Sequence, residues 1–178
     1  VGSEMCIRDS YGTIQKLYSK PTRDGDLIAF CEDKVFNILA NKDALFNADG
    51  NANITSNNAV LGQALPYTGQ FGISKNPESF ATYGFRSYFT DKARGAVLRL
   101  SRNGIEPISK DGMFDFFRDK LASCSLMIGS YDENKDQYNL TLTNLNETGV
   151  EDTVSYSESV KGWTSRHSFL QESGLSLN

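Results

Sequence analysis

The chain contains very little cysteine, histidine and proline, and it has no long apolar run. Among its 178 residues there are three Cys, four Pro and one His. Cys31 and Cys124 are isolated and lack CxxC spacing, which argues against a zinc ribbon and a disulfide-dense scaffold, so we expect two buried free thiols. With His167 as the only histidine, a His-based metal site or a Ser-His-Asp site has little support. No apolar segment is long enough to cross a membrane as a helix.

The charge balance is mildly acidic and argues against a nucleic-acid-binding surface. The net charge is −4 and the isoelectric point is near 5.0, so the chain has no overall basic field. Hydrophobic residues make up 39% and charged residues 22%, which is typical of a soluble globular protein. The glycines form neither a dinucleotide-binding fingerprint nor a phosphate-binding loop. We therefore expect no cofactor.

The first nine residues, VGSEMCIRD, do not resemble the start of a domain. They contain no apolar run, so they cannot be a secretory signal. Val1–Asp9 matches one reading frame of a transposon end and adaptor used to prepare sequencing libraries. We expect residues 1–9 to be a non-native, adaptor-derived segment that packs against nothing, and residues 10–178 to be a fragment of one β-rich domain. This interpretation also removes Cys6 from any redox argument.

Short strands and turns dominate the rest of the chain. Two apolar runs, Leu27–Cys31 and Val35–Leu39, flank a short polar turn and predict a hairpin, although helical spacing is the alternative. Residues 81–91 alternate, with Tyr83, Phe85, Ser87 and Phe89 on one face. Further strands over 95–100 and 105–108 complete a meander, and a strand pair is expected over 125–130 and 137–143. Strands are also expected over 153–156 and 165–169.

Two segments depart from this pattern. Residues 41–79 are rich in Asn, Gly, Ser and Pro, and we expect a long polar loop with at most one helical turn, near Asp43–Phe46. Asp111–Ala122 is the one segment with helical spacing, because four apolar residues form a single stripe. Asp111 is expected to cap this short amphipathic helix, with Ser109 as the alternative. The fold class is therefore mostly β, with antiparallel meanders and propeller-like blades, and the sequence covers a partial domain.

Few sequence motifs indicate a catalytic or metal-binding function. Asp132–Asp136 alternates oxygen ligands like a calcium loop, but Gln137 and Thr143 stand where that loop needs Gly and Glu, so a polar hairpin turn is favoured. The acidic residues around the helix suit a cap and a solvated face better than a glycosidase pair: Glu106, Asp111, Asp115 and Asp119. We expect no catalytic, cofactor-binding or metal-binding residue. The expected structural core residues are Tyr83, Phe85, Phe89, Leu98, Leu100, Phe116, Phe117, Tyr131 and Trp163.

Several stretches resemble virion structural proteins of tailed bacteriophages. The resemblance lies in KNPESF at Lys75–Phe80, YGFRSYFTD at Tyr83–Asp91, RGAVLRLS at Arg94–Ser101, and GSYD at Gly129–Asp132 with VKGWTS at Val160–Ser165. Together they are similar to the tail stabilisation or nozzle-like ("muzzle") proteins of crAss-like and marine Bacteroidetes phages, over about residues 26–178. Members of that family are much longer and continue past the segment that ends here at Asn178. Gln171 stands where a Pro is common in that family.

The resemblance implies a non-enzymatic protein of the virion tail, assembled in the bacterial host cytoplasm. It implies a homo-oligomeric ring below the portal, partnered by portal and tail subunits, without sequence-specific nucleic-acid binding or a membrane segment. The polar stretches 41–79 and 144–152 would then meet neighbouring subunits. The alternative is a secreted carbohydrate-binding or glycan-cleaving β-propeller module, which would need exposed aromatics and convergent carboxylates at one rim.

Overall fold

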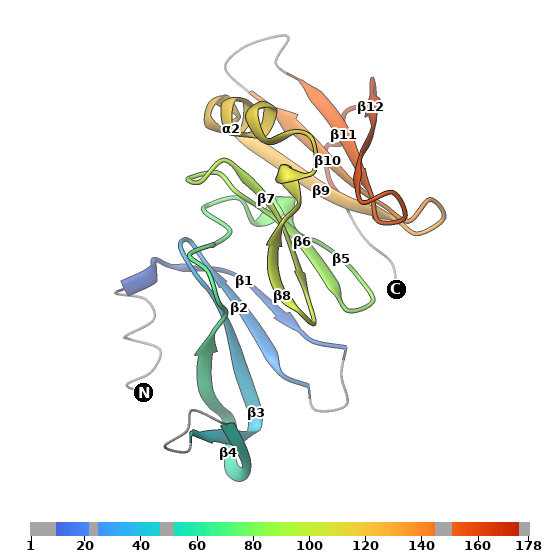
Figure 1. Ribbon diagram of the computed structural model, residues 1–178. Coiled ribbons are helices and arrows are strands. Elements are labelled where there is room, and N and C mark those ends of the chain that lie inside the picture. Colours follow the sequence, from blue (N-terminus) through green and yellow to red (C-terminus); the bar gives the residue numbers. More distant parts are fainter. Residues whose placement is uncertain (1–9, 22–24, 47–51, 145–150, 175–178) are drawn as a thin grey trace. The chain divides into compact units, whose positions relative to one another are not determined.

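The computed structural model describes residues 10–21, 25–46, 52–144 and 151–174 (Figure 1). The adaptor-derived interpretation of residues 1–9 falls outside the described residues. The chain divides into two compact units, residues 1–72 and 73–178, where the sequence analysis expected a single β-rich domain. The described part contains twelve strands in three four-stranded antiparallel sheets. The expectation of a mostly β fold built from antiparallel meanders is confirmed.

The first unit holds one sheet whose strands follow chain order. Its strands are β1 (Ile14–Ser19), β2 (Leu27–Cys31), β3 (Val35–Phe46) and β4 (Ala52–Pro66). The predicted hairpin of β2 and β3 is confirmed, because β-branched and aromatic residues dominate both runs. A small core forms around Ala29, Cys31 and Phe36, with Tyr11, Ile38 and Ala64 packed against it.

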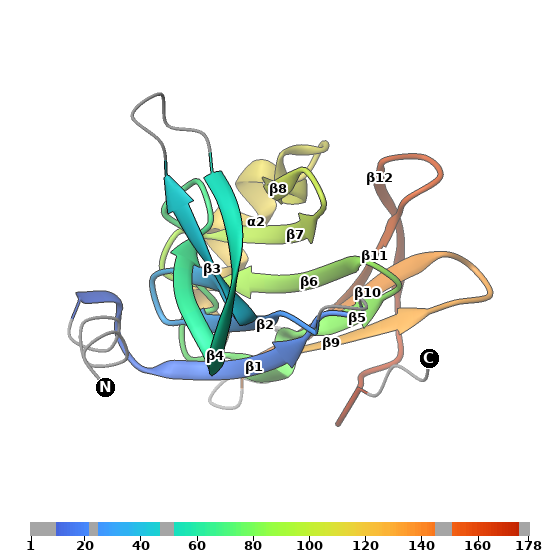
Figure 2. The ribbon, with the colours of Figure 1, turned by 90° about the horizontal axis from the view of Figure 1, so that it is seen from below.

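The long polar loop predicted over 41–79 is wrong for most of its length. β3 continues to Phe46, and β4 pairs with it antiparallel as a long twisted hairpin (Figure 2). The helical turn expected near Asp43–Phe46 is strand as well. Register shifts between Ile38 and Lys42 interrupt the strict alternation that a sequence pattern detects. Residues 67–76 lie outside the described strands, and a short 3-10 helix, η1, covers Pro77–Ser79.

The second unit contains two sheets and a helix. One sheet consists of β5 (Ala81–Tyr83), β6 (Arg86–Asp91), β7 (Ala96–Ser101) and β8 (Gly104–Pro107). After the 3-10 helix η2 (Ile108–Lys110) and the α-helix α2 (Phe114–Ser123), the other sheet is formed by β9 (Leu126–Asp132), β10 (Gln137–Thr143), β11 (Asp152–Ser157) and β12 (Gly162–His167). Both sheets are meanders in chain order.

A tight turn divides residues 81–91, for which the alternating pattern predicts one strand. Tyr83 pairs with Arg86, so Gly84 and Phe85 form a two-residue hairpin turn. Gly84 has φ +58, a conformation that suits the first central position of such a turn. The turn carries Phe85 out of the core: its side chain is 52% exposed and stacks under the Arg102 guanidinium, 4.0 Å from the ring centroid.

The helix begins three residues later than predicted. The 3-10 helix η2 occupies residues just before Asp111, which was expected to cap the α-helix. Met113 takes the N-cap position of α2 instead, without a side-chain hydrogen bond. The Asp111 carboxylate instead accepts a hydrogen bond of 2.9 Å from the Tyr156 hydroxyl. The apolar stripe is confirmed, because Phe117 and Leu121 are buried and Met113 and Phe116 pack at the edge of the same core.

Stacked tyrosines form the centre of the second unit. Tyr83, Tyr131, Tyr88 and Tyr138 follow one another with ring centroids 4.6, 5.5 and 4.8 Å apart. We call these four residues the tyrosine stack. Aromatic pairs of this kind each contribute about 0.5–1.5 kcal/mol beyond their burial. The Tyr138 hydroxyl donates to the Ser79 carbonyl at 2.7 Å, so the buried polar end of this ring is satisfied.

The expectation of buried free thiols is confirmed for Cys31 and Cys124. Each side chain is fully buried, in the first and second unit respectively. Burial raises the pKa of Cys31 to about 11, with a smaller contribution from the Glu32 charge, and it raises the pKa of Cys124 as well. Both thiols therefore stay protonated and unreactive at neutral pH.

Candidate functional site

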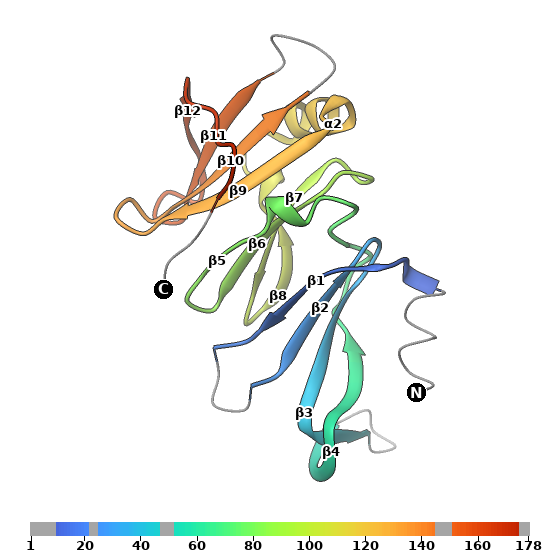
Figure 3. The same ribbon diagram turned by 180° about the vertical axis from the view of Figure 1, so that it is seen from behind.

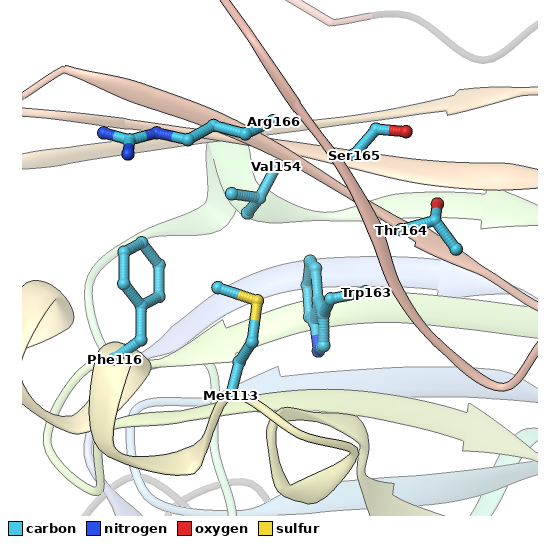
Figure 4. A pocket seen from close by; sticks show the side chains of 7 residues that line it. All are labelled: Met113, Phe116, Val154, Trp163, Thr164, Ser165 and Arg166. Carbon is cyan, nitrogen blue, oxygen red and sulfur yellow. The ribbon is translucent and has the colours of Figure 1, made fainter.

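A hollow of about 320 Å³ lies between α2 and the last strands of the second unit (Figure 4). Met113 and Phe116 contribute from the helix side, and Val154 and Trp163 come from β11 and β12. The remaining lining residues are Thr164, Ser165 and Arg166 of β12. We call this the α2–β12 hollow. Its volume is at the low end of ligand pockets, which span about 300–1,000 Å³, so it has room for one or two side chains.

The floor of the α2–β12 hollow is apolar and closely packed. The Trp163 ring packs against Phe117 at 4.4 Å and edge-on against Tyr156 at 5.4 Å. Its indole N–H donates to the Ile108 carbonyl at 3.0 Å, so the polar edge of the ring is satisfied inside the protein. A ligand in the hollow would therefore meet the ring through apolar contact.

Arg166, which lines the hollow, belongs to a trio of charged groups with Asp152 and Lys120, and we call these three residues the rim trio. The buried Asp152 carboxylate accepts a hydrogen bond of 2.6 Å from Arg166 Nε, and Lys120 Nζ lies 3.1 Å from its other oxygen. Burial opposes ionisation of Asp152, but the hydrogen bonds from Lys120 and Arg166 outweigh it and lower the pKa of this carboxyl. Two cations thus share one carboxylate, and one positive charge of the trio is left over.

A second charged cluster ties the β11–β12 turn to the neighbouring sheet. Glu158 accepts from the Tyr88 hydroxyl at 2.5 Å and from Arg99 Nη1 at 2.6 Å, and Arg86 lies 3.8 Å away. The Glu158 side chain is 7% exposed, while Glu106, the other partner of Arg99, is 47% exposed. Burial and then the hydrogen bond to Glu158 raise the pKa of Tyr88. Every charge here has an ionic partner, so the cluster is a structural connection between sheets.

A close serine–histidine contact in the second unit lacks the geometry of a nucleophile. Ser155 Oγ lies 2.7 Å from His167 Nε2 and donates to Asn139 Oδ1 at 2.5 Å. Because its single proton goes to Asn139, Ser155 accepts from His167, whose Nε2 therefore carries the proton and cannot serve as a base. Ser155 is also fully buried.

Most of the residues predicted for the core are buried in the described structure. Phe89, Leu98 and Phe117 have no exposed surface, and Leu100 and Tyr131 are nearly as buried. Tyr83, Phe116 and Trp163 are partly buried and pack against the main core. Phe85 is the exception, because the turn after Gly84 exposes it.

The acidic residues considered for catalysis do not converge. Asp115 and Asp119 both pair with Arg118 on the exposed face of α2. Glu106 pairs with Arg99, and Asp111 binds Tyr156. Asp132–Asp136 forms the hairpin turn that was favoured for it: the Asp132 carboxylate accepts from the backbone N–H groups of Asn134 and Lys135. Over the described residues, no group of three or more His, Cys, Asp or Glu could hold a metal ion.

The sequence pattern does not identify the residues that organise this region. Tyr88, Tyr138 and Tyr156 are not among the predicted core residues, yet all three are fully buried. Alternation placed Tyr88 on the face opposite Phe89, but both faces of β6 are buried, so a period-two pattern cannot select one. Glu158 lies in a turn after β11 and carried no signal that it would face another sheet.

No family model matches this chain, and no curated protein matches it either. Within the described chain, no helix combines the length and apolar character needed to span a membrane.

Proposed function

We propose that this chain is a non-enzymatic structural component of a tailed-phage virion, part of a tail or nozzle ring below the portal, and that it acts through contacts between subunits. The sequence stretches that resemble the tail stabilisation and muzzle proteins support this proposal. Its partners would be further copies of the same protein and other portal or tail subunits. Assembly would take place in the host cytoplasm.

The observation that carries the proposal is the repeated open meander. Three consecutive groups of four strands each form a sheet in simple chain order. Blades of β-propellers have this topology, and none of the three sheets closes on itself. Each sheet therefore ends in two edge strands, which a stable protein covers or pairs. Subunits packed in a ring are one way to cover them.

The test is electron microscopy of the full-length purified protein, together with its sedimentation over a range of concentrations. We expect closed rings and a sedimentation coefficient that rises with concentration toward that of an oligomer. A full-length protein that stays monomeric throughout would reject the proposal. Portal and capsid genes beside the reading frame would agree with it, whereas polysaccharide-utilisation genes would contradict it.

A second candidate function is carbohydrate binding, which the lining of the α2–β12 hollow favours. The aromatic rings of Phe116 and Trp163 line it together with the exposed Arg166, and ligand pockets combine aromatic side chains with a few polar groups that fix the orientation of the ligand. Because Trp163 is the only tryptophan, its fluorescence reports ligands in the hollow. A saturable fluorescence change with a glycan library, in a protein that stays monomeric, would favour this candidate over the virion role.

A further inference from the structure

The α2–β12 hollow and the C-terminal segment lie on opposite faces of one sheet. The register pairs Arg166 with Val154 and His167 with Thr153, and successive side chains of a strand point to opposite faces. Val154 and Arg166 line the hollow, so this face is turned toward α2. Thr153 and His167 therefore point to the other face.

Residues 168–174 cross that other face (Figure 3). The Thr153 hydroxyl donates to the Phe169 carbonyl at 2.7 Å, and the His167 ring lies 4.9 Å from the Phe169 ring. Further along, Gly174 lies directly over the Gly129 carbonyl of β9, with no space for a β-carbon. The backbone of this segment thus contacts the sheet, and we call it the C-terminal strap.

The two apolar side chains of the strap are only partly covered by the protein. Phe169 is 47% and Leu170 is 44% exposed, although both are large and hydrophobic. Glu172 follows two residues later and is also exposed. An adjacent exposed apolar pair next to a carboxylate is a common composition for a contact surface, because it combines apolar area with charge that sets the orientation.

The α2–β12 hollow complements the strap in its apolar surface and in its charge. Its floor of Met113, Phe116, Val154 and Trp163 is apolar and has room for one or two side chains. The rim trio of Lys120, Asp152 and Arg166 has one positive charge in excess. Arg166 is 70% exposed, so its guanidinium can be reached by an incoming carboxylate.

We propose that the α2–β12 hollow binds the C-terminal strap of a second copy of this chain, with Phe169 and Leu170 on the apolar floor and Glu172 beside Arg166. The strap of the same chain crosses the opposite face and cannot fill this hollow. The contact is therefore head-to-tail, and repeated contacts of this kind generate rings where the rotation closes and filaments where it does not. This inference rests on the proposed function, since it names the surface through which subunits associate.

The first test uses the full 178-residue chain and a capped synthetic peptide, Ser-Phe-Leu-Gln-Glu-Ser-Gly, which reproduces the strap. Trp163 is the only tryptophan and lines the hollow, so peptide binding is followed by its fluorescence. We expect a saturable change in intensity and emission wavelength. Arg166→Gln should weaken peptide binding about fivefold, which is the effect of one partly exposed ion pair near the upper end of its range.

Arg118→Gln is the matched control, because Arg118 is an exposed arginine of α2 with carboxylate partners of its own and lies outside the hollow. It should leave peptide binding unchanged. A peptide carrying Glu172→Gln should also bind about fivefold more weakly, and this loss should vanish with the Arg166→Gln protein if the two groups pair. Additive losses would show that Glu172 and Arg166 do not meet. Thermal unfolding of each variant checks that the protein remains folded.

The second test measures self-association by sedimentation. Phe169→Ser combined with Leu170→Ser should reduce association at least tenfold, whereas Val160→Ser, which replaces a 68% exposed residue in the β11–β12 turn, should not. If the protein associates but the Phe169–Leu170 variant associates equally well and the peptide gives no signal, this inference is wrong while the proposed function stands. If the protein never associates and Trp163 responds to glycans and not to the peptide, both are wrong.

Discussion

Glu158 offers a direct test of whether the two sheets of the second unit are held together by a buried charge. Its carboxylate accepts from the Tyr88 hydroxyl at 2.5 Å and from Arg99 at 2.6 Å, although it lies in the turn after β11. The change is Glu158→Ala. The matched control is Glu106→Ala, which removes the other carboxylate of the same arginine, 47% exposed instead of 7%.

The expected loss follows from burial. Glu158→Ala leaves the fully buried Tyr88 hydroxyl without its acceptor, which costs about 1–3 kcal/mol. It also breaks a partly buried ion pair, although Arg99 keeps Glu106 and so loses less than the full value for a buried pair, about 3–5 kcal/mol. We expect a total loss of about 3 kcal/mol in the free energy of unfolding. Glu106→Ala should cost about 0–1 kcal/mol, as exposed pairs do.

The measurement is urea unfolding followed by Trp163 fluorescence. Trp163 packs in the core of the second unit, so its signal reports the unfolding of that unit even if the first unit unfolds separately. The free energies are compared only where the dependence on urea is unchanged. Equal losses for the two variants, or a loss under about 1 kcal/mol for Glu158→Ala, would refute the argument that burial makes this carboxylate important.

Three further changes test other parts of the second unit. Burial raises the pKa of the tyrosine-stack members Tyr88, Tyr131 and Tyr138 above the ordinary value of 10.0, so their stabilising contribution is full below about pH 10 and is lost as the pH rises through the folded pKa. The tyrosinate absorbance of these residues should therefore rise together with alkaline unfolding. Ionisation of all tyrosines before unfolding would contradict this. Gly129→Ala should cost about 3 kcal/mol in urea unfolding, because the new β-carbon would lie 2.1 Å from the Ser79 carbonyl oxygen. Gly84→Ala, with free space but φ +58, should cost about 1–2 kcal/mol, and equal costs for the two variants would exclude the steric explanation. Asp152 has a lowered pKa, so its contribution to stability is full above about pH 3.8 and is lost as the pH falls through the folded pKa. Asp152→Asn should therefore flatten the acid side of the curve of unfolding free energy against pH. An unchanged curve would show that the rim trio contributes nothing to stability.

Local sequence patterns predict the secondary structure correctly where a strand or helix has one clear hydrophobic face or is followed by a strong turn signal. Leu27–Cys31 with Val35–Leu39, and residues 125–130 with 137–143, are predicted as hairpins and occur as such. The stripe of α2 was found because helical spacing does not depend on distant contacts. The β3–β4 hairpin was missed, since its strands are polar, interrupted by register shifts and poor in the alternation that reveals strands.

The parts of the candidate site depended on contacts between distant residues. The sequence by itself determined a mostly β chain with one amphipathic helix, buried thiols and an aromatic core, because these follow from composition and spacing. Only the tertiary structure decided that Phe85 faces solvent and that Tyr88 meets Glu158, 70 residues away. It also decided that Met113 and Trp163 line one hollow while the strap crosses the opposite face of the sheet. The physical reason is that burial and pairing of a side chain depend on which surfaces pack together, and that packing joins residues whose spacing along the chain carries no periodic signal.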